Sequence, residues 1–127
     1  MTRSRPDQWR RALTLRVDEL GLGRLTWTVG TVITGELART AMDLFAEASG
    51  DRSIPLLVDI TGTPSLTRDA RIAFSQRCSA SRVAVLGNAP THQVMASFLE
   101  VVTTFPVPVR YFTSERAAVK WLYDGAS

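Results

Sequence analysis

Three side chains in the middle of the sequence have the types that nucleophilic hydrolysis requires. Ser65 could attack a carbonyl or phosphoryl group, His92 could accept its proton, and Asp59 could orient the histidine. The sequence lacks the Gly-x-Ser-x-Gly turn that presents such a serine in α/β hydrolases. A single histidine in the first turn of a helix is also more often a surface or cap residue. We therefore predict that the protein is not an enzyme, and hydrolysis remains an alternative.

A wider set of polar residues surrounds these three. They follow predicted strands and open predicted helices, where free main-chain N–H groups favour anions. The candidate residues for binding a ligand or a partner are Asp59, Thr61, Thr63, Ser65, Thr67, Arg68, Asn88, Thr91, His92 and Ser114. The competing interpretation is that they are helix caps and turn formers, an ordinary role for such residues in α/β folds.

Period-two alternation near the N-terminus predicts the first two strands. Apolar residues alternate with polar ones over residues 13–17 and again over residues 25–29. Gly21 and Gly23 lie between these runs and suit a tight connection, because glycine readily adopts positive φ angles. We expect an antiparallel hairpin with one buried face.

Beyond the hairpin, apolar runs alternate with helical patterns. Thr34 is placed to cap a helix that ends near Gly50, and Thr67 is placed to cap a second helix over residues 67–79. The inner face predicted for the first helix comprises Leu37, Ala41, Leu44, Phe45 and Ala48. Further strands are expected over 54–60, 82–87 and 109–112, and a further helix over 90–102. Thr113 or Ser114 should cap a last helix, which is expected to dock through Ala118, Trp121 and Leu122.

The predicted element order is β-β-α-β-α-β-α-β-α, which indicates an α/β fold with a mixed sheet. Strands joined through helices should be parallel with right-handed crossovers, so the loops that carry the candidate residues should gather at one edge of the sheet. We assign residues 12–127 to a single domain and residues 1–11 to a basic N-terminal arm. Four arginines and one aspartate in this arm account for the whole formal net charge of +3. A short basic arm on a neutral domain is weak evidence for nucleic-acid binding, so we expect no such partner.

The counts of reactive residues restrict the chemistry further. Cys78 is the single cysteine and His92 the single histidine, which leaves no zinc-type cluster. Cys78 follows Phe74 by one helical turn and is expected to pack in the core. We expect no metal and no cofactor. No apolar run approaches the ~18 residues of a membrane helix and no export signal is evident, so we expect a cytoplasmic protein without a membrane span.

Three segments together resemble a known family. They are "ITGELARTAMDLF", "LLVDITGTPSLTRDA" and "FTSERAAVKWL", and a predicted hairpin precedes them. This arrangement resembles the STAS domain of bacterial anti-sigma-factor antagonists, which has the SpoIIAA-like fold. The likeness is to a group of small, mostly uncharacterised bacterial STAS-like proteins, and it covers residues 13–125.

The resemblance also says where a regulatory switch would lie. In the family, a partner kinase phosphorylates a serine in an Asp-Ser-Ser-Gly-like run at the start of a helix, which places a dianion there. Aligning Asp59 and Gly62 with the family's strand end puts this run on residues 67–70. The serine positions then fall on Arg68 and Asp69, so the usual phospho-serine switch is expected to be missing.

The resemblance therefore implies a regulatory or binding module that acts through a protein partner or a small anionic ligand. Ser65 and Thr67 remain as substitute phosphorylation sites. The alternative is a small ligand-binding protein or hydrolase that uses Ser65, Asn88 and His92. A homodimer is expected from the resemblance and from large aromatic residues near elements that could be sheet edges.

Overall fold

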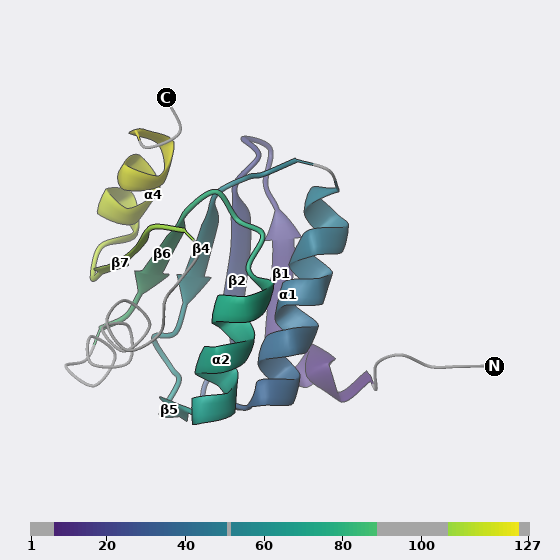
Figure 1. The fold of residues 1–127 in the computed structure, drawn as a ribbon. Coiled ribbons are helices and arrows are strands. Elements are labelled where there is room, and N and C mark those ends of the chain that lie inside the picture. Colours follow the sequence, from purple (N-terminus) through teal and green to yellow (C-terminus); the bar gives the residue numbers. More distant parts are fainter. Residues whose placement is uncertain (1–6, 51, 89–106, 125–127) are drawn as a thin grey trace.

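The computed structural model describes residues 7–50, 52–88 and 107–124 (Figure 1). The strands of its main sheet are β1 (Leu13–Val17), β2 (Gly23–Trp27), β4 (Leu56–Asp59), β6 (Val83–Leu86) and β7 (Val109–Phe112). The helices are η1 (Asp7–Arg11, a 3-10 helix), α1 (Gly35–Ser49), α2 (Arg68–Arg77) and α4 (Glu115–Asp124). The helix predicted over residues 90–102 lies outside the described residues. None of the described helices is long and apolar enough to cross a membrane.

The main sheet has the strand order β1-β2-β4-β6-β7. β1 and β2 are an antiparallel hairpin, whereas β2, β4, β6 and β7 are parallel neighbours. The predicted mixed α/β sheet with an N-terminal hairpin is therefore confirmed. One strand end was predicted wrongly: β2 ends at Trp27, and Val29 lies exposed in the following turn. The chain turns there because Gly30 adopts a φ of 89° and the Thr31 N–H donates to the Thr28 carbonyl oxygen.

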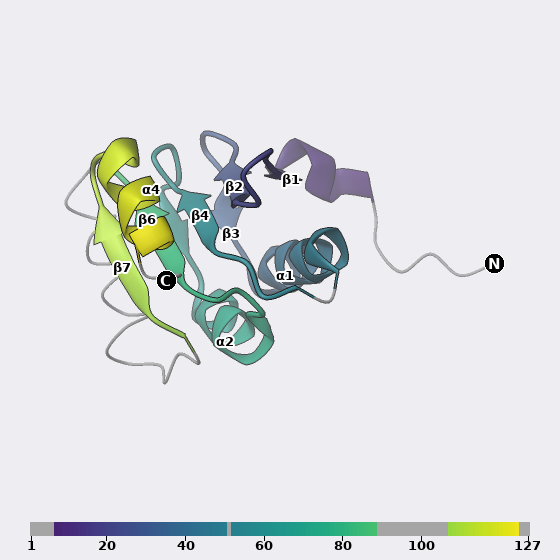
Figure 2. The same ribbon diagram turned by 90° about the horizontal axis from the view of Figure 1, so that it is seen from above.

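The helices lie on opposite faces of the sheet (Figure 2). α1 and α2 pack against each other on one face, called the inner face below, and α4 packs over β4, β6 and β7 on the outer face. The predicted caps form: the hydroxyl oxygens of Thr34 and Thr67 accept hydrogen bonds from the N–H groups of Leu37 and Ala70 at 3.2 and 3.1 Å. α2 ends two residues earlier than predicted, at Arg77.

The inner core lies between the sheet and α1 with α2, and it corrects the predicted face of α1. Phe45 and Ala41 are buried as expected, but Ala48 is exposed, and Leu37 and Leu44 are only partly buried. The buried residues of α1 are Gly35, Ala38, Thr40, Ala41, Met42, Phe45 and Ser49. The buried face is rotated because α1 contacts α2 as well as the sheet, so small side chains that face α2 are also covered.

A second, two-stranded sheet was not predicted. β3 (Val32–Ile33) and β5 (Ser65–Leu66) pair in parallel beside the N-termini of α1 and α2. Ser65 therefore lies in a strand and not in an irregular loop. Strands of two residues are too short to show a period, so only the tertiary structure reveals this pair.

The outer core attaches α4 to the sheet. Leu57, Ala84 and Leu86 of the sheet pack with Ala118 and Leu122 of α4, and Trp121 lies at the margin. The last predicted helix is therefore confirmed as α4, with Ala118 and Leu122 as its buried residues. α4 covers the apolar part of the outer face and leaves the outer face of β1 and β2 uncovered by any described element.

Candidate functional site

The carboxyl edge of the sheet is built around the segment that follows β4. Asp59 ends β4, and its Oδ1 accepts a hydrogen bond of 2.9 Å from the Thr61 N–H. The Thr63 N–H donates to the Ile60 carbonyl oxygen at 2.9 Å, and the Thr63 side chain is buried. These contacts fold the chain back toward α2, whose first residue, Arg68, is exposed.

The turn after β2 fastens this segment from the other side. The Gly30 N–H donates to the Gly62 carbonyl oxygen at 2.8 Å. Gly62 lies so close to Val29 that a Cβ on it would be 2.8 Å from the Val29 Cα, which real structures do not tolerate. The Thr67 N–H donates to the Ile33 carbonyl oxygen at 2.9 Å. The two segments therefore hold one another in a single arrangement.

The other predicted site residues are placed less closely together. Ser65 is exposed in β5, opposite Val32. Asn88 is exposed after β6, and Ser114 caps α4, where its hydroxyl accepts a hydrogen bond of 3.3 Å from the Ala117 N–H. Thr91 and His92 lie outside the described residues. Asp59, Thr61, Thr63, Ser65, Thr67 and Arg68 thus lie on the segment that leads from β4 into α2, whereas Asn88 follows β6 and Ser114 follows β7.

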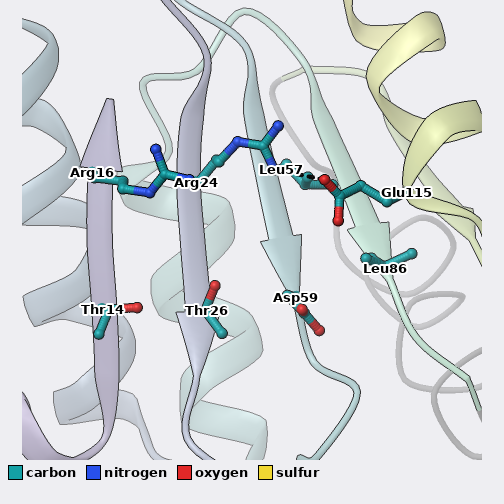
Figure 3. Close-up of a pocket in the computed structure, with 8 residues that line it drawn as sticks. All are labelled: Thr14, Arg16, Arg24, Thr26, Leu57, Asp59, Leu86 and Glu115. Atoms are coloured by element: carbon teal, nitrogen blue, oxygen red, sulfur yellow. Dashed lines mark hydrogen bonds and ion pairs between the residues drawn. The ribbon is translucent and has the colours of Figure 1, made fainter. Parts of the chain in front are cut away.

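A hollow on the outer face of the sheet was not predicted as a site (Figure 3). It has a volume of about 110 Å³. This outer-face hollow is lined by Thr14, Arg16, Arg24, Thr26, Leu57, Asp59, Leu86 and Glu115. Among the predicted site residues that the structure describes, Asp59 alone lines it.

The strand register explains how this lining arises. One row across the sheet consists of Thr14, Thr26, Asp59 and Leu86, which are direct neighbours on successive strands. The row beside it consists of Arg16, Arg24, Leu57 and Ala84. Each row is polar on β1 and β2 and apolar on β6, which α4 covers. The sequence contained a signal for this hollow. Alternate residues of a strand point to the same face, so the polar residues of β1 and β2 are expected together on the face opposite the core.

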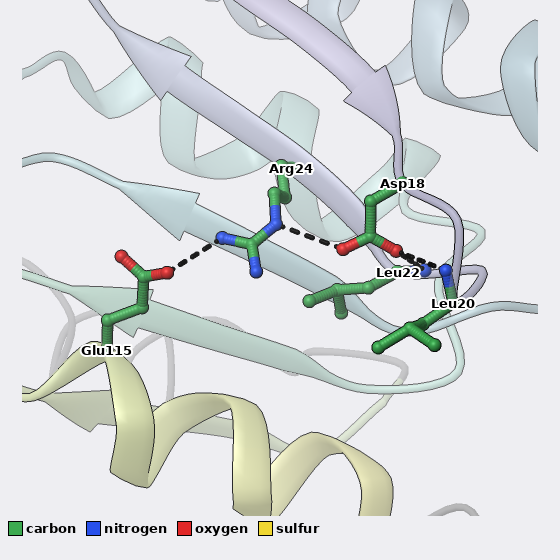
Figure 4. Close-up of polar contacts among 5 residues, drawn as sticks. All are labelled: Asp18, Leu20, Leu22, Arg24 and Glu115. Atoms are coloured by element: carbon green, nitrogen blue, oxygen red, sulfur yellow. Dashed lines mark hydrogen bonds and ion pairs between the residues drawn. The ribbon is translucent and has the colours of Figure 1, made fainter.

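Arg24 forms two ion pairs, one within the hairpin and one that connects the hairpin to α4 (Figure 4). Its Nε donates to Asp18 Oδ2 at 3.1 Å, and its Nη1 donates to Glu115 Oε2 at 3.0 Å. Asp18 Oδ1 also accepts hydrogen bonds from the N–H groups of Leu20 and Leu22, at 2.9 and 3.0 Å, which closes the hairpin turn. Arg24 is thus a structural residue at one end of the hollow.

The contacts of Asp18 shift its titration. Burial alone would raise the pKa of Asp18, but the hydrogen bonds from two main-chain N–H groups and from Arg24 lower it by more, so the pKa lies below its ordinary value of 3.8. A carboxylate with a lower pKa in the folded than in the unfolded state stabilises the fold above its unfolded pKa. That contribution is lost as the pH falls through the folded pKa.

We expect Asp18→Asn to lower the free energy of unfolding at pH 7 by about 2 kcal/mol. Asp18 accepts hydrogen bonds from two main-chain N–H groups and from Arg24, and a neutral amide with a single acceptor oxygen cannot replace all three. The difference between Asp18→Asn and the unmodified protein should shrink below about pH 4, where the unfolded-state carboxyl is protonated. Urea unfolding followed by circular dichroism at pH 7 and pH 3 measures both effects.

The matched control for this prediction is Asp43→Asn. Asp43 pairs with Arg77 at 3.1 Å, but both side chains are exposed, at 44% and 47%. Its loss should cost less than about 1 kcal/mol, since water screens exposed ion pairs. Equal losses for the two variants, or a loss for Asp18→Asn that does not change with pH, would contradict the role assigned to Asp18.

Comparison with a solved structure identifies the class of fold. A crystal structure from Shewanella loihica PV-4, of an uncharacterized protein from the DUF3478 family with a SpoIIAA-like fold, matches this chain with a TM-score of 0.60. The two chains are 19% identical, and the match covers 87% of this chain and 92% of that one. The protein is thus an α/β module with a SpoIIAA-like fold, and the likeness to this fold predicted from the sequence is confirmed.

The family can then be stated. The chain belongs to the family described as "Domain of unknown function (DUF7793)", whose model matches residues 19–125. A protein with unknown function from Arthrobacter sp. FB24, which has a crystal structure, is 38% identical to this chain in sequence. The match covers 94% of this chain and 96% of that chain, with a TM-score of 0.36. The comparison with curated proteins finds no match.

Proposed function

We propose that the protein is a non-enzymatic, STAS-like regulatory module that binds a protein partner through the carboxyl edge of its sheet. The proposed contact surface, called the edge surface below, consists of Val29, Val32, Thr61, Pro64 and Ser65, whose side chains are all exposed. One observation carries the proposal: the segments that present these side chains are fastened to one another.

The contacts between these segments order the edge surface before any partner binds. The Gly30–Gly62 hydrogen bond, the Val29–Gly62 contact and the β3–β5 pair hold the segments after β2 and β4 in one arrangement. A surface that is already ordered loses little conformational entropy when a partner binds. This supports recognition of a partner by a preformed surface.

The composition of the edge surface also supports a protein partner. Val29 is 82% exposed and Val32 is 43% exposed. Exposed apolar side chains bordered by hydroxyl groups match the apolar centre and polar rim of protein interfaces. Burying the Val29 side chain under a partner would contribute about 1.5 kcal/mol or more.

The polar groups nearby support binding more than catalysis. The Asp59 carboxylate and the Thr67 and Ser114 hydroxyls each accept a main-chain hydrogen bond as turn or cap residues. Arg68 and Asp69 stand where the resemblance places the family's phosphorylatable serines. The proposed regulation therefore does not use the usual phospho-serine switch.

We expect Val29→Lys to lose partner binding while the fold is kept. The test is affinity capture from a lysate of the source bacterium, with quantitative mass spectrometry of the captured proteins. A protein that binds the edge surface should be recovered at least about tenfold less with Val29→Lys, since a loss of 1.4 kcal/mol weakens affinity tenfold.

Leu20→Lys is the matched control, because Leu20 is 75% exposed but lies in the hairpin turn, away from the edge surface. It should capture the same proteins as the unmodified chain. If both variants capture the same proteins as the unmodified chain, the edge surface is not the binding surface.

The expected homodimer is part of the same proposal. β1 is an edge strand of the main sheet, and its inner-face residues Leu15 and Val17 are only partly buried. Pairing of β1 with the β1 of a second copy would extend both sheets. Light scattering of the purified protein, run beside the capture experiment, decides this point, and a monomer at the highest concentration tested would exclude the dimer.

A further inference from the structure

The outer-face hollow offers a chemistry that the edge surface does not use. It places guanidinium and hydroxyl groups on β1 and β2, an apolar floor on β4 and β6, and a carboxylate at the end of β4. We propose that this hollow binds a small zwitterion of the amino-acid type, with its carboxylate on Arg16 and its ammonium group on Asp59. The inference goes beyond the proposed function, because it requires neither a protein partner nor the edge surface.

Arg16 carries a positive charge that the described part of the chain does not neutralise. It lies directly across from Arg24 on the neighbouring strand, where two like charges repel each other. Arg24 is compensated by Asp18 and Glu115. Arg16 is exposed and forms no ion pair with any described residue. A ligand carboxylate would offset this repulsion and fit the planar fork of the guanidinium group.

Neighbouring donors can complete the carboxylate site. Arg24 uses Nε and Nη1 in its ion pairs, so its Nη2 keeps N–H groups for another acceptor. Thr14 and Thr26 present exposed hydroxyl groups in the adjacent row, and Figure 3 shows both on the same two strands as the two arginines. Each hydroxyl can donate to a second carboxylate oxygen.

The opposite end of the hollow suits a cationic donor. Asp59 Oδ1 accepts from the Thr61 N–H, and Oδ2 has no hydrogen-bond partner among the described residues. Asp59 is the direct neighbour of Thr26, so its carboxylate ends the same row. Leu57 and Leu86 also line the hollow beside it, and because both are more than nine-tenths buried, only their edges can contact a short apolar group. An ammonium group on Asp59 and an apolar body over the leucines complete the match.

The dimensions of the hollow favour a ligand of amino-acid size. A volume of about 110 Å³ holds several water-sized groups, since one such group needs about 10–15 Å³ by this measure. Arg16 on β1 and Asp59 on β4 lie two strands and two residues apart, so their Cα atoms are separated by about 12 Å. The long Arg16 side chain leans toward β2 in Figure 3, which shortens the gap that an α-amino acid has to bridge. Larger acids would have to extend beyond the lining residues.

The test measures binding of the standard amino acids to the full chain, first by thermal unfolding and then by isothermal titration calorimetry. At least one apolar amino acid should raise the melting temperature of the unmodified protein, because a ligand that binds only the folded state stabilises it. For that amino acid, Arg16→Gln and Asp59→Asn should each raise Kd by at least about tenfold. The asparagine keeps an oxygen that can accept from the Thr61 N–H, so the loop should stay folded.

Two controls separate this site from others. Arg110→Gln removes an exposed arginine from the same row of the sheet, at the other edge, and should bind the ligand like the unmodified protein. Val29→Lys should also bind normally, so failure here and failure of the partner proposal are distinguishable. Analogues of the ligand that lack the amino group, or lack the carboxylate, should each bind at least about tenfold more weakly.

Three results would overturn the proposal. The first is that no amino acid stabilises the unmodified protein. The second is that Arg16→Gln binds the ligand as tightly as Arg110→Gln does. The third is that the analogue without an amino group binds as tightly as the amino acid. The last result would assign the hollow to simple carboxylates and remove the role of Asp59.

Discussion

Replacing Phe45 by alanine should lower the free energy of unfolding by about 3–5 kcal/mol, because it empties the centre of the inner core. The Phe45 ring is fully buried between α1 and the sheet. It lies over Gly23 of β2, where a Cβ would be only 2.5 Å from Phe45 Cε1. The ring thus occupies the place that a side chain at residue 23 would take, and no neighbour can fill the cavity without moving the sheet or the helix.

The matched control is Leu44→Ala, one position away on α1, where the side chain is only partly buried. Its loss should be clearly smaller, because less apolar area is removed from contact. Urea unfolding of the two variants, monitored by circular dichroism, gives the comparison. Losses of equal size would mean that Phe45 does not have the central position described here.

Phe74→Ala should also cost about 3–5 kcal/mol. Phe74 of α2 is buried against Trp27 of β2, with the ring centroids 6.5 Å apart and the ring planes at 76°. This edge-to-face contact joins α2 to the end of β2, the second strand of the sheet. The contact itself is worth about 0.5–1.5 kcal/mol beyond the buried area, so Phe74→Leu should recover only part of the loss.

Ile72→Ala is the control for this prediction, because Ile72 lies on the same helix and is 39% exposed. Chemical unfolding followed by tryptophan fluorescence is the suitable measurement, since Trp27 is one of the two aromatic partners. If Phe74→Leu and Phe74→Ala lose the same stability, the leucine gains nothing from burial and the described packing is wrong. If Ile72→Ala loses as much as Phe74→Ala, α2 does not bury the face described here.

Asp59 lines the outer-face hollow and also supports the edge surface, although it is not one of the residues that form the edge surface. One of its carboxylate oxygens holds the Thr61 N–H beside the edge surface, and the same side chain lines the outer-face hollow. The two sets of variants therefore avoid relying on Asp59 alone: Val29 reports on the edge surface and Arg16 on the hollow.

Local patterns in the sequence determined much of the fold. The alternation in residues 13–17, the apolar run over residues 56–58 of β4 and the cap residues Thr34, Thr67 and Ser114 each act over a few neighbouring positions. Such signals depend on steric preferences and hydrogen bonds within one element, so they can be read without knowing its neighbours. The resemblance to the SpoIIAA-like fold followed from their order.

Contacts between distant elements decided the rest. The buried face of α1 depends on α2 as well as on the sheet, which is why Ala48 was predicted inside and is exposed. The β3–β5 pair joins segments that are more than thirty residues apart. The outer-face hollow depends on a register that places Arg16, Arg24 and Asp59 on one face of three neighbouring strands, and on α4 covering only part of that face. Which polar side chains meet is set by strand order and helix packing, and these are properties of the assembled chain that no local pattern contains.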